Sequence, residues 1–201
     1  MIIGITGGIG SGKSTIAQEL RQMGYAVYDT DSAAKRLIVE DAAVREQISI
    51  LLGPEVYQDN IYQTAIVAQR VFSDPSLLAQ LNAIVHPAVQ ADILRWAQTI
   101  NHSTPSYTTL HHTTPCFIEC AILYQAGFDS LCNKVVAVTA PEEIRLERVI
   151  ARDHSDINKV RARMRAQEAE KDVQRADIVV NNDGTIPILT LCEDIIQQLT
   201  E

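Results

Sequence analysis

The sequence lacks the features that mark membrane, secreted and disulfide-stapled proteins. Its 201 residues contain no apolar run close to the roughly 20 residues that a membrane-spanning helix needs. The N-terminus shows no basic segment followed by an apolar one and a cleavage site, so we expect no secretory signal. The four cysteines have no C-x-x-C spacing. We therefore expect reduced, buried thiols in a cytoplasmic protein, with neither a disulfide framework nor a zinc site.

The chain also lacks a basic excess. Asp and Glu outnumber Lys and Arg by 25 to 17, which gives a formal net charge of −8. A nucleic-acid backbone or an acidic membrane surface requires a basic footprint, so we expect neither as a partner. Nine of the basic residues lie between Glu142 and Arg175, among eight acidic ones, so this window is more basic than the rest. The length suits one core domain with a modest insertion, and we expect a monomer while leaving oligomers open.

The most informative segment that is present lies at the N-terminus. Residues 3–15 read IGITGGIGSGKST, and Gly7, Gly12, Lys13 and Ser14 occupy the fixed positions of G-x-x-x-x-G-K-[ST]. An apolar strand precedes this loop, and apolar residues recur at helical spacing after it. Glycines allow backbone N–H groups to surround phosphates, and the helix N-terminus adds partial positive charge. The motif predicts a nucleotide site, with Lys13 on the β- and γ-phosphates and the Ser14 hydroxyl on Mg²⁺.

Strand-like segments that alternate with helical patterns predict a parallel sheet. They are residues 1–5, 25–28, 117–119, 134–139 and 178–181. The stretch between the second and third segments reads as several consecutive helices and is too long for a single crossover. We predict an α/β fold of the P-loop NTPase type, with three layers and a central parallel five-stranded sheet. Its parts are a core (1–31, 116–141 and 176–201), a helical acceptor-binding insertion (about 32–100) and a helical lid (about 142–175).

Two carboxylates follow the second predicted strand. Asp29 and Asp31 lie at its carboxyl end, where open parallel sheets place their ligands. We predict that Asp31 orients an acceptor hydroxyl and takes its proton as the γ-phosphoryl group leaves ATP. Helix capping is the alternative, and Asp29 fits it better than Asp31 does. Within the insertion, His86 is a candidate contact to the acceptor, although we also expect the His86-Pro87 pair to interrupt or kink a helix.

Further charged residues are candidates for the metal and for the transferring phosphate. Glu119 ends the third predicted strand, where a carboxylate can contact Mg²⁺ or its water shell, but a structural glutamate fits equally well. Arg145, Arg148 and Arg152 share one helical face. We predict that Arg148 and Arg152 belong to a mobile lid that neutralises charge on the transferring phosphoryl group. The three arginines in 161–165 are assigned to a solvated face.

Several segments along the chain occur in an order and at a spacing that are typical of one protein family. They are residues 5–15 (ITGGIGSGKST), 25–37 (YAVYDTDSAAKRL), 71–74 (VFSD), 81–87 (LNAIVHP), Arg148 with Arg152, Gln167, and 176–184 (ADIVVNNDG). Together they make the chain resemble the dephospho-coenzyme A kinase family over nearly its whole length.

This resemblance implies the last step of coenzyme A synthesis, in which ATP, with Mg²⁺, phosphorylates the ribose 3′-hydroxyl of dephospho-coenzyme A. The helical insertion would then bind the acceptor. The site residues that the resemblance implies are catalytic Asp31, a lid with Arg148 and Arg152, an adenine border at Asn182 and Gly184, and an ATP phosphate site formed by Gly10, Ser11, Gly12, Lys13, Ser14 and Thr15.

The chain departs from the family pattern in the acceptor region. An acidic family position after the third strand is Gln125 here, and the Gly and Arg that usually precede the helix around Phe72 correspond to Asn60 and Thr64. A missing arginine would reduce contact with a phosphate of the acceptor. These differences concern acceptor recognition and leave the nucleotide site intact.

Two other functions share part of the pattern. A nucleoside monophosphate kinase or another metabolite kinase would have the same ATP site. A nucleoside monophosphate kinase, however, would need arginines in the insertion to bind the acceptor phosphate, and the insertion offers few basic residues. A nucleotide-dependent switch protein would carry a guanine-reading N-K-x-D motif. The Asn133-Lys134 pair is instead followed by two valines, so that reading is disfavoured.

Overall fold

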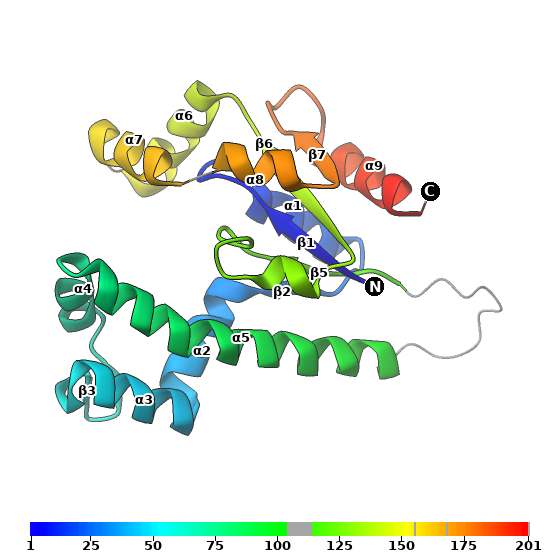
Figure 1. Cartoon of the computed structure of the whole chain (residues 1–201). Helices are drawn as coiled ribbons and strands as arrows, with labels where there is room; N and C mark the ends of the chain where they lie inside the picture. Colours follow the sequence, from blue (N-terminus) through cyan, green and yellow to red (C-terminus); the bar gives the residue numbers. More distant parts are fainter. Residues whose placement is uncertain (104–113, 155, 168, 201) are drawn as a thin grey trace. The chain divides into compact units, whose positions relative to one another are not determined.

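The computed structural model describes residues 1–103, 114–154, 156–167 and 169–200. The chain divides into two compact units, shown with their helices and strands in Figure 1. The first unit comprises Met1–Tyr28 with Ile100–Glu201, and the second comprises Asp29–Thr99. None of the described helices is long and apolar enough to cross a membrane.

The first unit contains a five-stranded sheet in the order β2-β5-β1-β6-β7. Its strands are β1 (Ile2–Thr6), β2 (Val27–Asp29), β5 (Cys116–Glu119), β6 (Lys134–Thr139) and β7 (Ile178–Asn181). The central strand β1 pairs in parallel with β5 and β6, and β6 pairs in parallel with β7. Burial on both faces explains why β1, β5 and β6 read as continuous apolar runs. The predicted strands are confirmed with nearly the predicted bounds, as is the predicted α/β fold.

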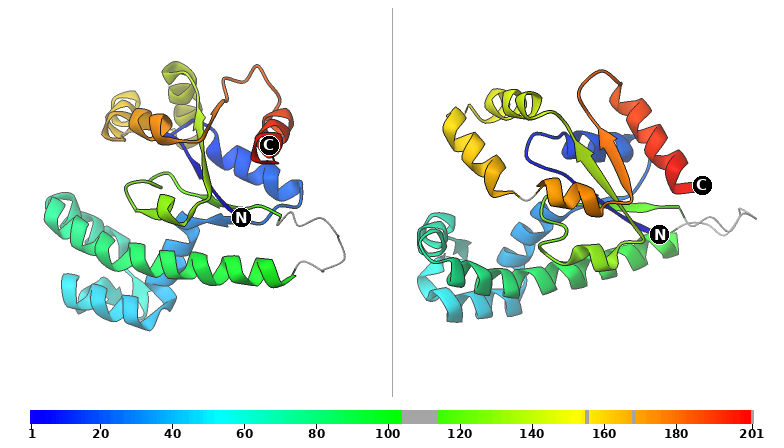
Figure 2. Two further views of the ribbon diagram at one scale, coloured as in Figure 1. Left: turned by 45° about the vertical axis from the view of Figure 1, so that its right-hand side comes forward. Right: turned by 45° about the horizontal axis from the view of Figure 1, so that its top comes forward.

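Five helices surround this sheet among the described residues of the first unit. They are α1 (Lys13–Gln22), α6 (Glu142–Asp153), α7 (Ile157–Ala166), α8 (Ala169–Arg175) and α9 (Ile188–Thr200). Helices α1 and α9 pack against each other and cover one face of the sheet, as the two views of Figure 2 show. Ile16 and Leu20 of α1 and Ile195 of α9 are fully buried in this core. Helices α6 and α7 form a hairpin, and their buried apolar residues make a second, smaller cluster.

The second unit is mainly helical. Its elements are α2 (Thr30–Glu40), α3 (Ala42–Leu52), the 3₁₀ turn η1 (Pro54–Val56), β3 (Tyr57–Gln58), β4 (Ile61–Tyr62), α4 (Thr64–Phe72) and α5 (Pro75–Ser103). The antiparallel hairpin of β3 and β4 was not predicted. Its two turn residues, Asp59 and Asn60, both have positive φ (51° and 63°), a conformation that Asp and Asn tolerate better than most residues.

Helix α5 corrects one sequence prediction. An interruption or a kink was expected at His86-Pro87; the interruption is wrong, because α5 continues through Pro87 as one helix, and the kink stays a prediction. A proline inside a helix removes a backbone hydrogen bond and costs about 3 kcal/mol. On the same helix, Val85, Val89 and Ile93 are buried at helical spacing. Burying such side chains contributes about 1.5–3 kcal/mol each, which offsets the cost of the proline.

The cysteines behave as small apolar residues. All four are free thiols, and Cys116, Cys120 and Cys192 are buried. Burial raises the pKa of the Cys132 and Cys192 thiols to about 12, so both stay protonated at neutral pH. Among the described residues, no cluster of three or more His, Cys, Asp and Glu side chains is arranged to hold a metal ion.

Candidate functional site

The glycine-rich loop between β1 and α1 is in close contact with two other parts of the first unit. At Gly10 (φ +80°), a Cβ atom would lie 2.4 Å from the backbone oxygen of Arg145 in α6. At Gly12 (φ +91°), it would lie 2.1 Å from Nδ2 of Asn182, which follows β7. Both backbone conformation and close approach therefore require glycine at these two positions.

Side chains outside the loop bind its carbonyl groups. Arg145 Nε donates to the carbonyl of Ile9 at 3.0 Å, and Asn182 Nδ2 donates to that of Ser11 at 2.9 Å. Because a trans peptide directs its C=O and the following N–H to opposite sides, the amides of Gly10 and Gly12 point away from these side chains. The contacts thus fix the orientation of the amide groups that a phosphate-binding loop uses.

Arg148 joins the loop to the segment after β7. Its guanidinium donates to the carbonyl of Asn182 at 3.0 Å, with longer contacts of 3.5 Å to the carbonyls of Gly10 and Ser11. Asn182 itself is only 3% exposed, so its amide group acts inside the protein. Hydrogen bonds therefore connect three residues that were predicted to lie in the ATP site: Arg148, Asn182 and Ser11.

A cavity of about 310 Å³ opens along the loop and the start of α1. Its lining residues are Gly10, Gly12, Lys13, Ser14, Thr15, Arg148, Val149 and Arg152. Most of the residues predicted to bind the ATP phosphates meet here, together with both predicted lid arginines. Ser11 differs from them, because it is only 1% exposed and its hydroxyl has no hydrogen-bond partner among the described residues. Gly184 is exposed in the loop after β7, and a Cβ there would lie 3.7 Å from the Arg148 guanidinium.

The two predicted metal ligands are in direct contact. The Ser14 hydroxyl donates to Oε1 of Glu119 at 2.5 Å. Glu119 ends β5, the neighbour of β1 in the sheet, and is 9% exposed. A hydroxyl and a carboxylate are hard oxygen ligands of the kind Mg²⁺ prefers, and Mg²⁺ commonly keeps several waters beside one or two such groups. The residues present therefore fit a magnesium ion at this edge of the sheet.

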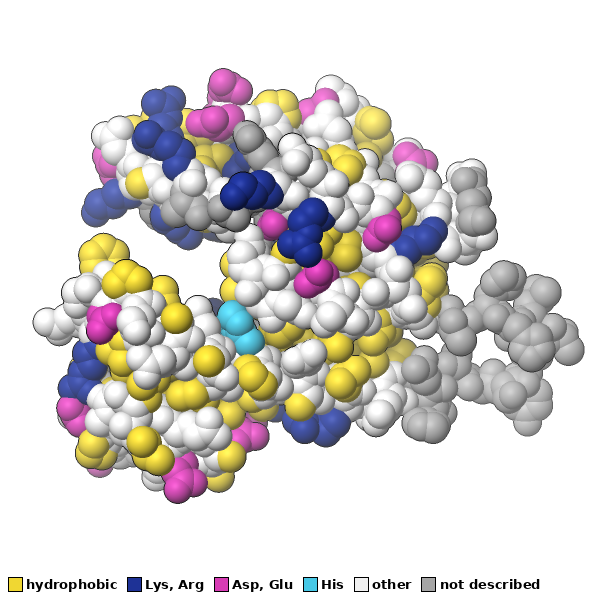
Figure 3. Space-filling view, in the orientation of Figure 1, with side chains coloured by type: hydrophobic (Ala, Val, Ile, Leu, Met, Phe, Trp, Pro, Cys, Tyr) yellow, Lys and Arg dark blue, Asp and Glu magenta, His cyan; other side chains and the backbone are white. Residues whose placement is uncertain are grey.

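The outer arginines of the α6–α7 hairpin are exposed. Arg152 donates to the carboxylate of Asp153 at 2.6 Å and lowers the pKa of that carboxyl group. Arg163 approaches the same carboxylate at 3.6 Å. Arg161 and Arg165 are also exposed, as expected for a solvated face, and Figure 3 shows Lys and Arg side chains gathered over α6 and α7.

The two aspartates at the end of β2 and the start of α2 have different environments. Asp29 caps α2, since its carboxylate accepts from the N–H groups of Asp31 and Ser32 at 3.0 and 3.1 Å. Its expected capping role is confirmed. Asp31 lies exposed in the first turn of α2, and its carboxylate takes no part in this cap. His86 is half-buried in α5, and burial lowers its pKa. The acceptor roles of Asp31 and His86 stay predictions.

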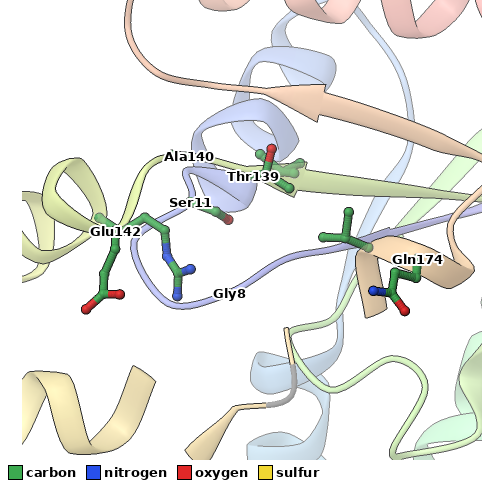
Figure 4. A pocket seen from close by; sticks show the side chains of 9 residues that line it. Gly8, Ser11, Thr139, Ala140, Glu142 and Gln174 are labelled. Carbon is green, nitrogen blue, oxygen red and sulfur yellow. The ribbon is translucent and has the colours of Figure 1, made fainter. Parts of the chain in front are cut away.

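A second pocket of about 460 Å³ lies on another side of the loop and was not predicted. Its lining residues are Gly8, Ser11, Val138, Thr139, Ala140, Glu142, Arg145, Val173 and Gln174. Figure 4 shows Ser11, Thr139 and Ala140 close together in it, with Glu142 and Gln174 on opposite sides. Sheet topology could have predicted this pocket. Parallel sheets bind ligands at the carboxyl ends of their strands, and Thr139 ends β6, the neighbour of β1.

The departures from the family pattern have local explanations at two positions. Gln125 Nε2 makes long contacts of 3.4 and 3.5 Å to the carboxylate of Asp172, which is 5% exposed. An acidic residue at 125 would place two carboxylates together, so the neutral amide suits this environment. Asn60 occupies the left-handed turn of the β3–β4 hairpin, where a glycine would also fit, and accepts from Arg45 at 3.0 Å.

Comparison with family models and with curated proteins gives one family. A family model described as dephospho-CoA kinase matches residues 1–187. A dephospho-CoA kinase of Porphyromonas gingivalis is 41% identical over 174 residues, which cover 87% of this chain and 81% of the relative. The crystal structure of TT1252 from Thermus thermophilus matches with a TM-score of 0.82 and 33% identity, covering 100% of this chain and 98% of that one. A dephospho-CoA kinase structure from Campylobacter jejuni shares the fold, with a TM-score of 0.69, 22% identity and coverage of 98% and 96%.

Proposed function

We propose that this chain, which belongs to the dephospho-CoA kinase family, transfers the γ-phosphoryl group of ATP to the ribose 3′-hydroxyl of dephospho-coenzyme A. The products would be ADP and coenzyme A. The observation that carries the donor half of this proposal is the cavity in which the phosphate loop, Lys13 and Arg148 meet.

The donor site accounts for ATP binding through groups of this chain. Inward amides of the loop and the N-terminus of α1 would surround the phosphates, and Lys13 would neutralise the β- and γ-phosphates. Asn182 and Gly184, on the loop after β7, would border the adenine. Ser11 contributes its backbone, because its side chain is buried and its carbonyl is bound by Asn182.

Ser14 and Glu119 would hold Mg²⁺, directly or through its water shell. A magnesium ion held there would supply positive charge that offsets the negative charge of the phosphates during transfer. Arg148 and Arg152 both line the cavity, so their guanidinium groups would serve the same purpose on the transferring phosphoryl group. Their present partners are backbone carbonyls for Arg148 and Asp153 for Arg152, and both would exchange these partners for phosphate oxygens.

Asp31 would act on the acceptor as the general base. Its carboxylate would accept the proton of the 3′-hydroxyl while that oxygen bonds to the γ-phosphorus and the bond from phosphorus to the ADP oxygen breaks. The capping geometry supports this assignment, because Asp29 already satisfies the N-terminus of α2 and leaves the exposed Asp31 carboxylate available. His86 would contact the same acceptor from α5.

The remaining expectations are also proposals. We infer a monomer that works in the cytoplasm, where coenzyme A synthesis would supply the acceptor and where buried, protonated thiols suit a reducing environment. Another P-loop nucleoside monophosphate or metabolite kinase is the main alternative, since it would use the same donor site.

The deciding experiment measures ADP release with ATP and Mg²⁺ against separate acceptors: dephospho-coenzyme A, AMP and a simple metabolite alcohol. We expect turnover with dephospho-coenzyme A and, on analysis of the product, a phosphate on the ribose 3′-oxygen. A Lys13→Ala variant with unchanged circular dichroism is the control for contaminating kinases and should be inactive. Turnover of another acceptor without turnover of dephospho-coenzyme A would refute the acceptor assignment.

A further inference from the structure

Ile9, in the phosphate loop, contacts both α6 and the residue that follows α7. It occupies one of the positions that the G-x-x-x-x-G-K-[ST] pattern leaves open. Its N–H donates to Oε1 of Gln167 at 2.7 Å, and its carbonyl accepts from Nε of Arg145 at 3.0 Å. Its side chain packs against the apolar cluster of α6 and α7. All three functional parts of this one residue therefore engage the lid.

The two residues that bind the Ile9 backbone lie near the beginning and just after the end of the α6–α7 hairpin. Arg145 is in the first turn of α6, and Gln167 directly follows α7. Between them lie the buried residues of the lid cluster: Leu146, Val149, Val160 and Met164. The hairpin thus leaves Ile9 and returns to it, so a shift of either end would break a hydrogen bond to the loop.

The contacts to Ile9 also restrict its neighbours. A Cβ at Gly10 would meet the Arg145 backbone, so the loop is packed directly against α6 at the next residue. A partly buried N–H or C=O group that loses its partner is destabilising, which favours the orientations of the Gly8–Ile9 and Ile9–Gly10 peptide groups that keep both hydrogen bonds. A loop already in its binding geometry pays less conformational entropy when a ligand arrives.

We propose that Gln167 is a positioning residue for the nucleotide phosphates. From its position just after α7, it binds the N–H of the Gly8–Ile9 peptide group and thereby holds the phosphate loop in its binding conformation, without contacting the nucleotide itself. Binding free energies are reciprocal, so a bound nucleotide stabilises the same lid contact that favours its own binding. The proposal requires the donor site of the proposed function, but it does not depend on the acceptor.

Three variants separate the acceptor oxygen of Gln167 from its bulk. Gln167→Leu keeps a similar size and removes the oxygen, whereas Gln167→Glu keeps an oxygen that can accept from Ile9. The charge of the introduced carboxylate would lie beside Arg145, which binds the same residue. Gln198→Leu makes the same chemical change at an exposed position on α9 and serves as the matched control.

The measurements are ADP affinity by calorimetry, hydrogen exchange of the Ile9 amide by NMR, and steady-state kinetics. We expect Gln167→Leu to weaken ADP binding about five- to tenfold, as for one lost hydrogen bond, and to speed exchange at Ile9. The KM for ATP should rise by a similar factor while kcat at saturating ATP changes little. Gln167→Glu and Gln198→Leu should resemble the unsubstituted protein, and added ADP should slow exchange at Ile9 in all but Gln167→Leu.

Several results would overturn the proposal. Wild-type ADP affinity in Gln167→Leu would show that the bond to Ile9 does not shape the phosphate site. Equal losses in Gln167→Glu and Gln167→Leu would show that the acceptor oxygen is not the cause. Absence of ADP binding in the unsubstituted protein would remove the donor site of the proposed function as well, and so differs from either of these results.

Discussion

Gly12 and Asn182 offer a quantitative test of how the phosphate loop is supported. In Gly12→Ala, the new Cβ would lie 2.1 Å from Asn182 Nδ2, so the asparagine must move. Its hydrogen bond to the Ser11 carbonyl would be lost inside the protein, at a cost of about 1–3 kcal/mol. Alanine at φ +91° adds about 1–2 kcal/mol of backbone strain. We therefore expect Gly12→Ala to lower the free energy of unfolding by about 2–5 kcal/mol in total.

A double-mutant cycle separates these two contributions. Asn182→Ala alone should cost about 1–3 kcal/mol, because the Ser11 carbonyl loses its 2.9 Å hydrogen bond while the 3.5 Å contact from Arg148 remains. Adding Gly12→Ala to that variant should then cost only the backbone strain, about 1–2 kcal/mol. The effects of the two substitutions should therefore be less than additive by about 1–3 kcal/mol.

Urea unfolding of the four proteins, followed by circular dichroism, measures this coupling. The backbone signal is preferable to fluorescence because the single tryptophan, Trp96, lies in the second unit, whereas Gly12 and Asn182 lie in the first. Additivity within about 0.5 kcal/mol would refute the reasoning, since it would mean that Asn182 does not have to move when Gly12 gains a side chain.

Two further predictions concern the proposed base and metal site. Asp31→Asn should lower kcat about a hundredfold or more with little change in the urea midpoint, whereas Asp29→Ala should lower stability by about 1 kcal/mol through loss of the α2 cap. The opposite pattern would exchange the roles of the two aspartates. Glu119→Gln should raise the Mg²⁺ concentration for half-maximal turnover about tenfold or more. A Mg²⁺ titration unchanged by this substitution would argue against a metal role for Glu119 and favour a structural one, such as its hydrogen bond to Ser14.

The sheet and the phosphate loop were predictable because their signals are local. Each strand is a short apolar run, and the loop has fixed residues between a strand and a helix. The same local logic assigned the α2 cap to Asp29, which the structure confirms. The contact between Glu119 and the loop also follows from a general rule, since the carboxyl ends of parallel strands share one edge of the sheet.

Two features were not predicted correctly: the continuity of α5, which depends on longer-range packing, and the β3–β4 hairpin, whose turn sequence was overlooked. Pro87 suggested a break, but burial of residues on either side of it keeps α5 continuous. The β3–β4 hairpin did carry a signal, the Asp59-Asn60 pair between short apolar stretches, which is a recognised source of turns with positive φ.

The contacts of Arg145 and Gln167 with the loop could not be derived from periodicity. The spacing of Arg145, Arg148 and Arg152 predicted a shared face, but not that Arg145 would bind Ile9 while Arg152 remains exposed. Gln167 lies 158 residues from Ile9 in the sequence, and no local pattern links an isolated glutamine to a loop so distant. Such contacts depend on where the completed fold places the ends of helices.

Because Arg145 and Gln167 both bind Ile9, the N-terminal end of α6 is fixed to the loop, and any movement of α6 would be a rotation about that fixed end, here called the clamp. Arg148 lies three residues from the clamp at Arg145, whereas Arg152 lies seven residues away, or about 10 Å along the helix axis. Any rotation about the clamp would displace Arg152 more than twice as far as Arg148. Arg148 would then stay beside the loop while it exchanges backbone carbonyls for phosphate oxygens, whereas Arg152 would approach and leave with each nucleotide.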